Sequence, residues 1–443
     1  MRNVVLGIVL AVLSPCCSFA HEFIVDGICY NVTSEEEKTV EVTYNEDEKY
    51  AIKRKFYKDV VFVPEKVEFD GKEYTVTAIG EKAFHLNDEL LSVVMPKTIE
   101  SIGHDAFANC PKLKSLTIPE NVRDLQNFSF RGLPSLESLV VDEKNEFFDS
   151  REGCNAIIKT HSNALYVGCK NTVIPDGGKA IANGAFLTCF GGREIEPFEI
   201  TVPKSVEVIE HQAFAGCYPL KAVNFSEGLK KIGGNAFIGT PIKRVVIPAS
   251  VTEIDPGAFA ACDSLKVIKV KRGNKVYDSR KGCNAIIESE TGRLIVSCTA
   301  TEIPEGVKII ATNAFVKSAI KEVKFPSSLE LIEYYAFGDC RELKKIVDEI
   351  LDKAKSDPKT YLESEKEGSF VVQSREYRIS IAYPPFAEAL EVTIVRPVAN
   401  ISLDEYHLSD KLLEKEKEYQ KTLKDLGNMR TSLEKEFDNC LSL

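Results

Sequence analysis

Two stretches of this chain repeat the same residue types in the same order, and those types could support nucleophilic chemistry. "DSREGCNAII" covers residues 149–158 and "DSRKGCNAII" covers 278–287, so that only Glu152 and Lys281 differ. The cysteine in each copy would need a general base and an electropositive setting to act as a nucleophile. Neither copy contains a histidine, and the nearest one, His161, has no counterpart after the second copy. We therefore expect both decapeptides to be structural.

The sequence around the decapeptides is a repeat built on a recurring phenylalanine. Successive anchors are mostly 22 or 23 residues apart, with one interval of 28 and two of 56 that each contain a decapeptide. This period predicts a solenoid, in which stacked coils bury a face that one coil cannot bury alone. The anchors that follow Ala are Phe84, Phe107, Phe186, Phe214, Phe237, Phe259, Phe315 and Phe337, and Phe130 follows Ser.

Each unit carries the pattern of one short strand. In "LKSLTIPENVRDL", Leu113, Leu116 and Ile118 are apolar, polar residues alternate with them, and Pro119 ends the strand. We expect the apolar columns of successive units to form internal ladders, with the phenylalanines closing the coils.

The repeated "AFxxCxxLxxVxIPxSVxxIGxxAF" pattern resembles the BspA-like leucine-rich repeat family of bacterial surface proteins. "VDGICYNVTS" before the array and "YDSRKGCNAII" inside it are also similar to members of that family, and the resemblance covers residues 23–345. It implies a right-handed solenoid with short parallel strands on one face, and it supplies no catalytic residues to carry over to this chain. We expect no cofactor. The resemblance also implies adhesion, or binding of host extracellular proteins such as fibronectin and fibrinogen.

Most cysteines follow the repeat and indicate small buried positions. Three residues after each anchor, cysteine alternates with Asn, Leu, Thr and Ser, a variation that a catalytic or metal-ligand position would not accept. The hairpin-bearing coils at 142–176 and 271–305 differ, because each places two cysteines at the ends of a predicted hairpin. Two outcomes are open there: reduced core thiols, or disulfides, which exported proteins commonly contain. The pairs are Cys154 with Cys169 and Cys283 with Cys298.

The two ends of the chain differ from the array. Residues 1–20 have a positive residue, an apolar run and a small-x-small site, which predict a secretory signal peptide; a lipoprotein signal fits poorly because Pro15 precedes Cys16. Residues 21–76 are expected to form an N-terminal β cap from the strands "FIVDGICYNV", "KTVEVTY" and "EYTVTAI", before the array at 77–345.

Residues 346–443 are expected to form an α+β region: a helix continuing from Arg341, three strands within 369–397 and a long terminal helix. The terminal helix has an apolar stripe, which either packs on the small β unit or self-associates as a coiled coil. The stripe contains Leu412, Tyr419, Leu426 and Leu433.

The net charge and the positions of the lysines restrict the classes of ligand that the protein could bind. The net charge of −11 argues against nucleic acid, and no later apolar run is long enough to cross a membrane. Within this acidic chain, lysine recurs directly after the first apolar residue of successive strands, which predicts either solvated strand starts or a ridge for an acidic glycan or protein segment. The lysines are Lys114, Lys221, Lys243, Lys266, Lys321 and Lys344, and Glu137 occupies the equivalent place once.

Together these features predict an α/β-type repeat solenoid dominated by short parallel strands. We expect an exported, non-enzymatic protein, at the cell surface, in the periplasm or outside the cell, that binds an extracellular protein or acidic glycan. The alternative is a structural protein that assembles through residues 346–443 and uses the solenoid as a spacer.

Overall fold

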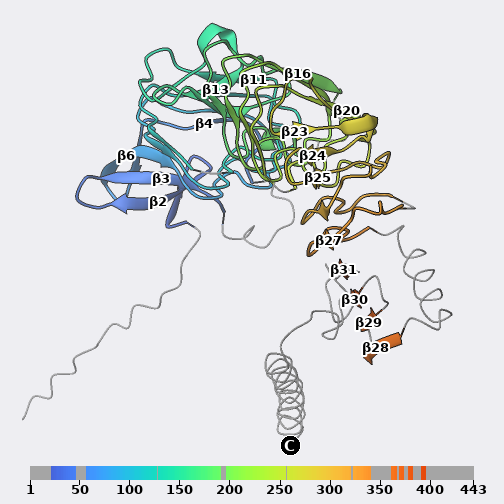
Figure 1. Ribbon diagram of the computed structural model, residues 1–443. Helices are drawn as coiled ribbons and strands as arrows, with labels where there is room; N and C mark the ends of the chain where they lie inside the picture. Colours follow the sequence, from blue (N-terminus) through green and yellow to red (C-terminus); the bar gives the residue numbers. More distant parts are fainter. Residues whose placement is uncertain are drawn as a thin grey trace, which may run out of the picture.

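The computed structural model describes most of the chain from residue 21 to residue 340. The described residues are 21–45, 56–126, 128–190, 196–255, 257–320 and 323–340, together with the backbone of four strands between 361 and 395. They follow an arc, with the N-terminal strands at one end and β27 at the other (Figure 1). The signal-peptide, long-helix and Arg341-helix predictions lie outside the described residues.

Six strands form the N-terminal unit. The stretch "FIVDGICYNV" is not the single strand expected, because Asp26 and Gly27 have φ values of 49° and 77° and turn it into a hairpin. The proposed boundary at residue 76 falls inside β6, which pairs with β3 on one side and with β8 of the array on the other. The unit is therefore continuous with the first coil. Its strands are β1 (Phe23–Val25), β2 (Ile28–Ser34), β3 (Thr39–Thr43), β4 (Asp59–Phe62), β5 (Lys66–Phe69) and β6 (Lys72–Ile79).

The expected parallel strands are present, which confirms a strand-rich repeat solenoid, and the coils place them in two sets. In β9, Leu116 and Ile118 are buried while Thr117 faces solvent, as the alternation predicts. The longer set is β7 (Leu90–Val94), β9 (Ser115–Ile118), β11 (Ser138–Val141), β16 (Phe198–Val202), β18 (Leu220–Phe225), β20 (Arg244–Ile247) and β22 (Val267–Val270). The two-residue set is β8 (Ser101–Ile102), β10 (Asp124–Leu125), β15 (Ala180–Ile181), β17 (Val208–Ile209), β19 (Lys231–Ile232), β21 (Glu253–Ile254), β26 (Ile309–Ile310) and β27 (Leu331–Ile332).

The anchor phenylalanines stack inside the array. Phe214, fully buried, lies between Phe186 and Phe237 with ring centroids 4.5 and 5.0 Å away and nearly parallel planes. The pairs Phe84 with Phe107 and Phe315 with Phe337 repeat this arrangement near the two ends. Within the described residues no α-helix is present. The helical elements are three-residue 3-10 turns, η2 (Arg151–Gly153), η3 (Leu187–Cys189) and η4 (Arg280–Gly282).

Both long intervals contain the predicted hairpin, and each hairpin has an extra short strand before it. The antiparallel pairs are β13 with β14 and β24 with β25. The first hairpin joins the two hydrophobic clusters of the protein, since Ile158 belongs to one and Ile157 to the other. Their strands are β12 (Phe148–Asp149), β13 (Ala156–Lys159), β14 (Ala164–Gly168), β23 (Tyr277–Asp278), β24 (Ile286–Glu288) and β25 (Arg293–Val296).

The C-terminal region continues the last sheet of the array. Four strands are present where three were expected, and β31 pairs antiparallel with β27 through Leu331 and Val395. The additional strand, β28, lies before residue 369, where the prediction began. The strands are β28 (Tyr361–Lys366), β29 (Ser369–Gln373), β30 (Arg378–Ala382) and β31 (Glu391–Val395). Among the described residues, no helix has the length and apolar character needed to cross a bilayer.

Candidate functional site

The first decapeptide closes the edge of a parallel sheet. The sheet β4-β7-β9-β11 ends at β11, and side chains of the decapeptide bind the outer edge of that strand. Asn155 Oδ1 accepts a hydrogen bond from the Leu139 amide at 2.7 Å, and Asn155 Nδ2 donates to the Glu137 carbonyl at 2.9 Å. Ser150 Oγ accepts from the Val141 amide at 2.9 Å. The unpaired amides and carbonyls of an exposed edge strand can pair with another chain and cause aggregation. These side-chain contacts pair those groups on β11 instead.

The backbone of the decapeptide explains why its residue types recur. Asn155 and Gly153 have φ values of 53° and 63°, and Asn284 and Gly282 have 54° and 68° in the second copy. Asparagine and glycine tolerate this left-handed region better than other residues. The second copy follows β22, which ends the sheet β20-β22.

An internal ion pair holds each decapeptide. Asp149 Oδ1 and Oδ2 accept from Arg151 Nε at 2.8 Å and Nη2 at 2.5 Å. Asp278 and Arg280 repeat the pair at 2.8 and 2.6 Å. The guanidinium lowers the pKa of each carboxyl group, although burial acts in the opposite direction. In each decapeptide the aspartate and the arginine are therefore paired with each other, which gives them a structural role.

The decapeptide cysteines have no activating environment. Burial raises the pKa of the Cys154 thiol and of the Cys283 thiol, so both stay protonated at neutral pH. Their sulfur atoms lie near the carbonyl oxygens of Ala156 and Ala285, at 3.8 and 4.0 Å. This setting lacks the thiolate that nucleophilic attack requires, so the arrangement serves packing.

The four paired cysteines are free thiols in the structure. Cys154 packs in one hydrophobic cluster, whereas Cys169 packs in the other and accepts a hydrogen bond from Asn155 Nδ2 at 3.2 Å. Cys283 and Cys298 are likewise buried and free. The structure thus contains the reduced alternative, with no disulfide in either hairpin.

The column of cysteines beside the anchors has a repeated hydrogen bond. Cys110, Cys262 and Cys340 donate to the carbonyl of the anchor phenylalanine in the preceding coil, at 2.9, 3.1 and 2.9 Å. Cys189 and Cys217 hydrogen-bond to each other. These thiols are buried links between coils.

The structure divides the expected lysine ridge. Lys221, Lys243 and Lys266 occupy three successive coils and are exposed, and the Lys266 amide donates to the Lys243 carbonyl at 3.1 Å. Lys114 is exposed but separated from the other three lysines. Glu137 holds the equivalent position in the next coil, where it forms an ion pair with Lys170 at 3.5 Å. Lys321 and Lys344 lie outside the described residues.

Two further cations, which lie outside the lysine column expected from the sequence, extend the three-lysine group. Arg244 and Lys269 are exposed on β20 and β22, where alternate side chains face solvent. We call Lys221, Lys243, Arg244, Lys266 and Lys269 the basic patch. No ion pair involves any of the five within the described part of the chain.

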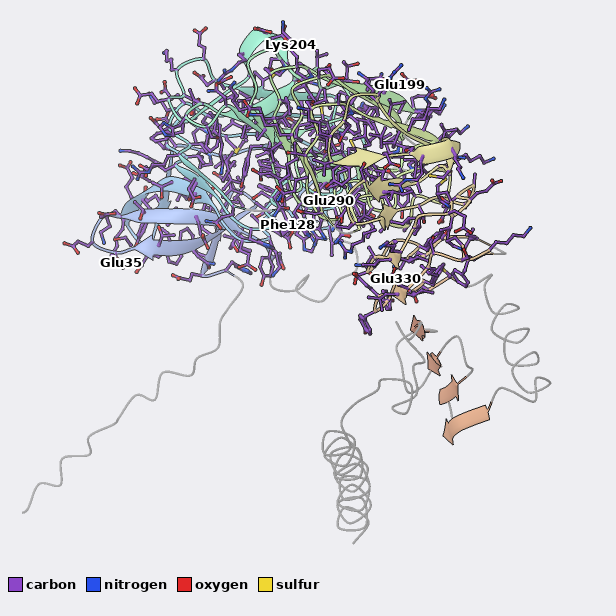
Figure 2. All side chains as sticks on the ribbon, in the orientation of Figure 1. Glu35, Phe128, Glu199, Lys204, Glu290 and Glu330 are labelled. Carbon is purple, nitrogen blue, oxygen red and sulfur yellow. The ribbon has the colours of Figure 1, made fainter. Side chains whose placement is uncertain are left out.

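The surroundings of the basic patch are polar and open. Thr201 and Asn224 are exposed and pair in register across β16 and β18. Glu199, on the outer side of the arc, bounds the patch on β16 (Figure 2). Neighbouring parallel strands lie about 4.8 Å apart, so the cations form a dense array. Such a surface can bind an extended anion. Within the described residues, no group of three His, Cys, Asp or Glu side chains is placed to hold a metal ion.

A comparison with protein-family profiles agrees with the repeat. A profile of the BspA type leucine rich repeat region matches in 6 copies, at residues 65–161, 188–289 and 285–356. A leucine rich cell surface protein of Faecalibacterium prausnitzii is 22% identical, with 73% of this chain and 81% of that one covered and a TM-score of 0.41. A leucine-rich repeat protein of Bacteroides ovatus is 21% identical at the same coverages, with a TM-score of 0.38.

One further match is to a short segment of a curated protein. Over 77 residues the chain is 49% identical to an uncharacterized KH and PIN-domain containing protein of Methanocaldococcus jannaschii. The match covers 17% of this chain and 12% of that protein, so the chain spans only a small part of that relative's length.

Proposed function

Because this chain belongs to the BspA type leucine-rich repeat family, whose repeats match more than half of it, we propose that it is an exported, non-enzymatic binding protein. Its ligand is an acidic glycan, held by the basic patch on the outer side of the arc. The observation that carries the proposal is a run of five exposed cations without ion-pair partners among the described residues, in a chain of net charge −11.

The open shape of the patch favours a linear polyanion. Cations on successive strands offer a repeated contact along the solenoid, and electrostatic complementarity of this kind speeds association and selects partners by charge. Exposed Thr201 and Asn224 add hydrogen-bonding groups suited to sugar hydroxyls. An acidic protein segment shares the charge and is the competing ligand.

The rigidity of the array supports weak, repeated contacts. Hydrogen-bonded coils and stacked phenylalanines fix the strand positions before a ligand arrives. A preorganised surface loses little conformational entropy on binding, so several modest contacts suffice. Export by the expected signal peptide would bring this surface to extracellular glycans, and N-terminal sequencing of the secreted protein should give His21 as the first residue.

The test is binding of the mature protein to immobilised heparin across a salt series. We expect retention that weakens as salt screens the charges. The triple variant Lys221→Glu, Lys243→Glu and Lys266→Glu should lose at least tenfold in affinity at physiological salt.

A matched control changes the same charge elsewhere. Lys58, Lys144 and Lys275 are exposed, outside the patch and without ion-pair partners among the described residues. Their triple change to Glu should lower affinity less than threefold. Equal losses in both variants would reduce the effect to net charge and overturn the patch. If the mature protein binds a polyglutamate peptide more tightly than heparin, the ligand is an acidic protein segment.

The alternative role, assembly through the C-terminal region, depends on the terminal stripe of Leu412, Tyr419, Leu426 and Leu433, which lies outside the described residues. Sedimentation of the mature protein distinguishes the two roles, because a monomer that retains heparin binding has no need of assembly.

A further inference from the structure

The turns that carry the anchor phenylalanines form a second continuous surface. Backbone hydrogen bonds join each turn to the next, and they also cross both long intervals. The Gly132 amide donates to the Leu187 carbonyl at 2.8 Å, and the Ala261 amide lies 3.4 Å from the Val316 carbonyl. The hairpin-bearing coils therefore leave this turn column unbroken.

A groove of about 660 Å³ runs along the turn column. Its lining reaches from His104 to Lys317 and so crosses seven consecutive turns. This volume lies within the roughly 300–1,000 Å³ typical of ligand sites. The floor is mainly apolar and includes Leu187, Ala215 and Ile238.

Phe128 presents a partly exposed aromatic ring near one end of the groove. It is 39% exposed and has a φ of 64°, in the left-handed region that bulky residues avoid. This φ belongs to the repeat, because equivalent positions in other turns share it whatever residue they carry: Lys82, Asp105, Gln212, Asn235, Asn313 and Tyr335. Figure 2 places Phe128 on the inner side of the arc, opposite to Glu199. The exposed aromatic ring, which continues the apolar surface of the groove, points to a binding role.

Phe190 presents a second aromatic surface in the same groove. It is 46% exposed and lies directly against Gly216, where a Cβ atom would come within 2.4 Å of its ring. Glycine is therefore required at this position to seat the ring. Tyr218, two residues after Gly216 in the sequence, is 37% exposed and also lines the groove.

Cations lie at both ends of the groove. At one end, Arg131 binds Asp105 through Nε at 2.8 Å and Nη2 at 3.4 Å, which leaves Nη1 for a ligand, and His104 packs edge-on against Phe128. At the other end, Lys317 is exposed and has no ion pair among the described residues. The apolar middle and cationic ends match a ligand with the complementary pattern.

We propose that this groove binds an extended peptide segment with apolar, aromatic-rich residues in its middle and carboxylates at its ends. Six steps of about 4.8 Å between turns give about 29 Å, the length of about nine extended residues. The aromatic rings of the peptide would lie against Phe128 and Phe190. The site is distinct from the basic patch, which lies on the outer side of the arc and takes a polar polyanion.

The test uses the mature protein and a labelled nonapeptide, acetyl-DFSFSFSFD-amide, followed by fluorescence anisotropy. We expect saturable binding at one site. Phe128→Asn should weaken it at least tenfold while leaving the urea midpoint equal or higher, because asparagine tolerates the left-handed φ. A structural role for Phe128 would instead lower the midpoint. Phe147→Asn is the matched control, since Phe147 is 50% exposed and outside the groove.

Charge exchange tests the orientation of the ligand. Lys317→Glu should weaken the acidic peptide and strengthen the matched peptide with lysine at both ends. The basic-patch triple variant should bind the acidic peptide within twofold of the unmodified protein, so that failure of this proposal is separable from failure of glycan binding. The proposal is overturned if Phe128→Asn binds like Phe147→Asn, or if the patch variant alone abolishes binding.

Discussion

The amide side chain of Asn155 occupies the place of a missing strand beside Leu139. Its oxygen accepts the Leu139 amide at 2.7 Å, and its nitrogen donates to the carbonyl of Glu137 at 2.9 Å. One side chain thus satisfies both a donor and an acceptor that the next parallel strand would otherwise pair. The residues of this decapeptide, whose types could support a nucleophile, instead cap the edge strand of a sheet.

Replacing Asn155 by glycine should destabilise the protein. Glycine keeps the left-handed φ of 53° but removes both hydrogen bonds, so we expect a loss of about 1–3 kcal/mol in the free energy of unfolding. Urea denaturation followed by circular dichroism measures it. Glu152→Gly is the control, because Glu152 also has a positive φ but is exposed, and its stability should stay equal or rise. A midpoint unchanged in Asn155→Gly would contradict the capping role.

The phenylalanine stack should respond most strongly at its centre. Phe214→Ala removes a fully buried ring with a stacked neighbour on each side, and we expect a cost of about 3–5 kcal/mol. Phe325→Ala, at a ring that is 37% exposed and edge-on to Phe337, should cost far less. Chemical denaturation of both variants compares them. Similar costs in the two variants would contradict the expected contribution of the buried stack.

Thiol counting decides the redox state of the hairpin cysteines. The mature chain has 11 cysteines, and we expect all of them to react with iodoacetamide after denaturation without a reductant, as judged by intact mass. In the folded protein the ten described cysteines should be protected, since all are buried. A count of seven after denaturation would instead indicate disulfides joining Cys154 to Cys169 and Cys283 to Cys298.

Stability should fall at alkaline pH because of the buried thiols. Burial raises the pKa of Cys262 and of Cys340 from 9.0 to about 12. Unfolded thiols ionise above pH 9 whereas folded ones do not, so the stabilisation is complete below pH 9 and is lost as pH rises to about 12. Each thiol contributes a slope of about 1.4 kcal/mol per pH unit in this window.

The variant Cys262→Thr isolates one of these thiols. Threonine already occupies the equivalent place as Thr240, so the coil can accept it. Urea midpoints between pH 8 and pH 11 should decline less steeply than in the unmodified protein, by about one thiol's share. An identical decline would show that Cys262 does not contribute.

Periodicity in the sequence determined the repeat, because burying one apolar face per coil requires apolar residues at fixed spacing. The anchor phenylalanines, the strand alternation around Leu116 and the hairpins in both long intervals could all be predicted from residue types alone. The same reasoning identified Lys221, Lys243 and Lys266 as one column, since equivalent positions in successive coils lie side by side.

The tertiary structure decided which residues of different coils contact one another, because residue spacing in the sequence does not determine those contacts. Whether Lys114 joins the other lysines depends on Glu137 and Lys170 in the intervening coils, and the partner of Asn155 is a backbone 16 residues away. The groove brings His104 and Lys317 to two ends of one surface, because the turns stay hydrogen-bonded across both long intervals. Contacts between coils depend on where the chain returns, and that path is fixed only when the coils stack.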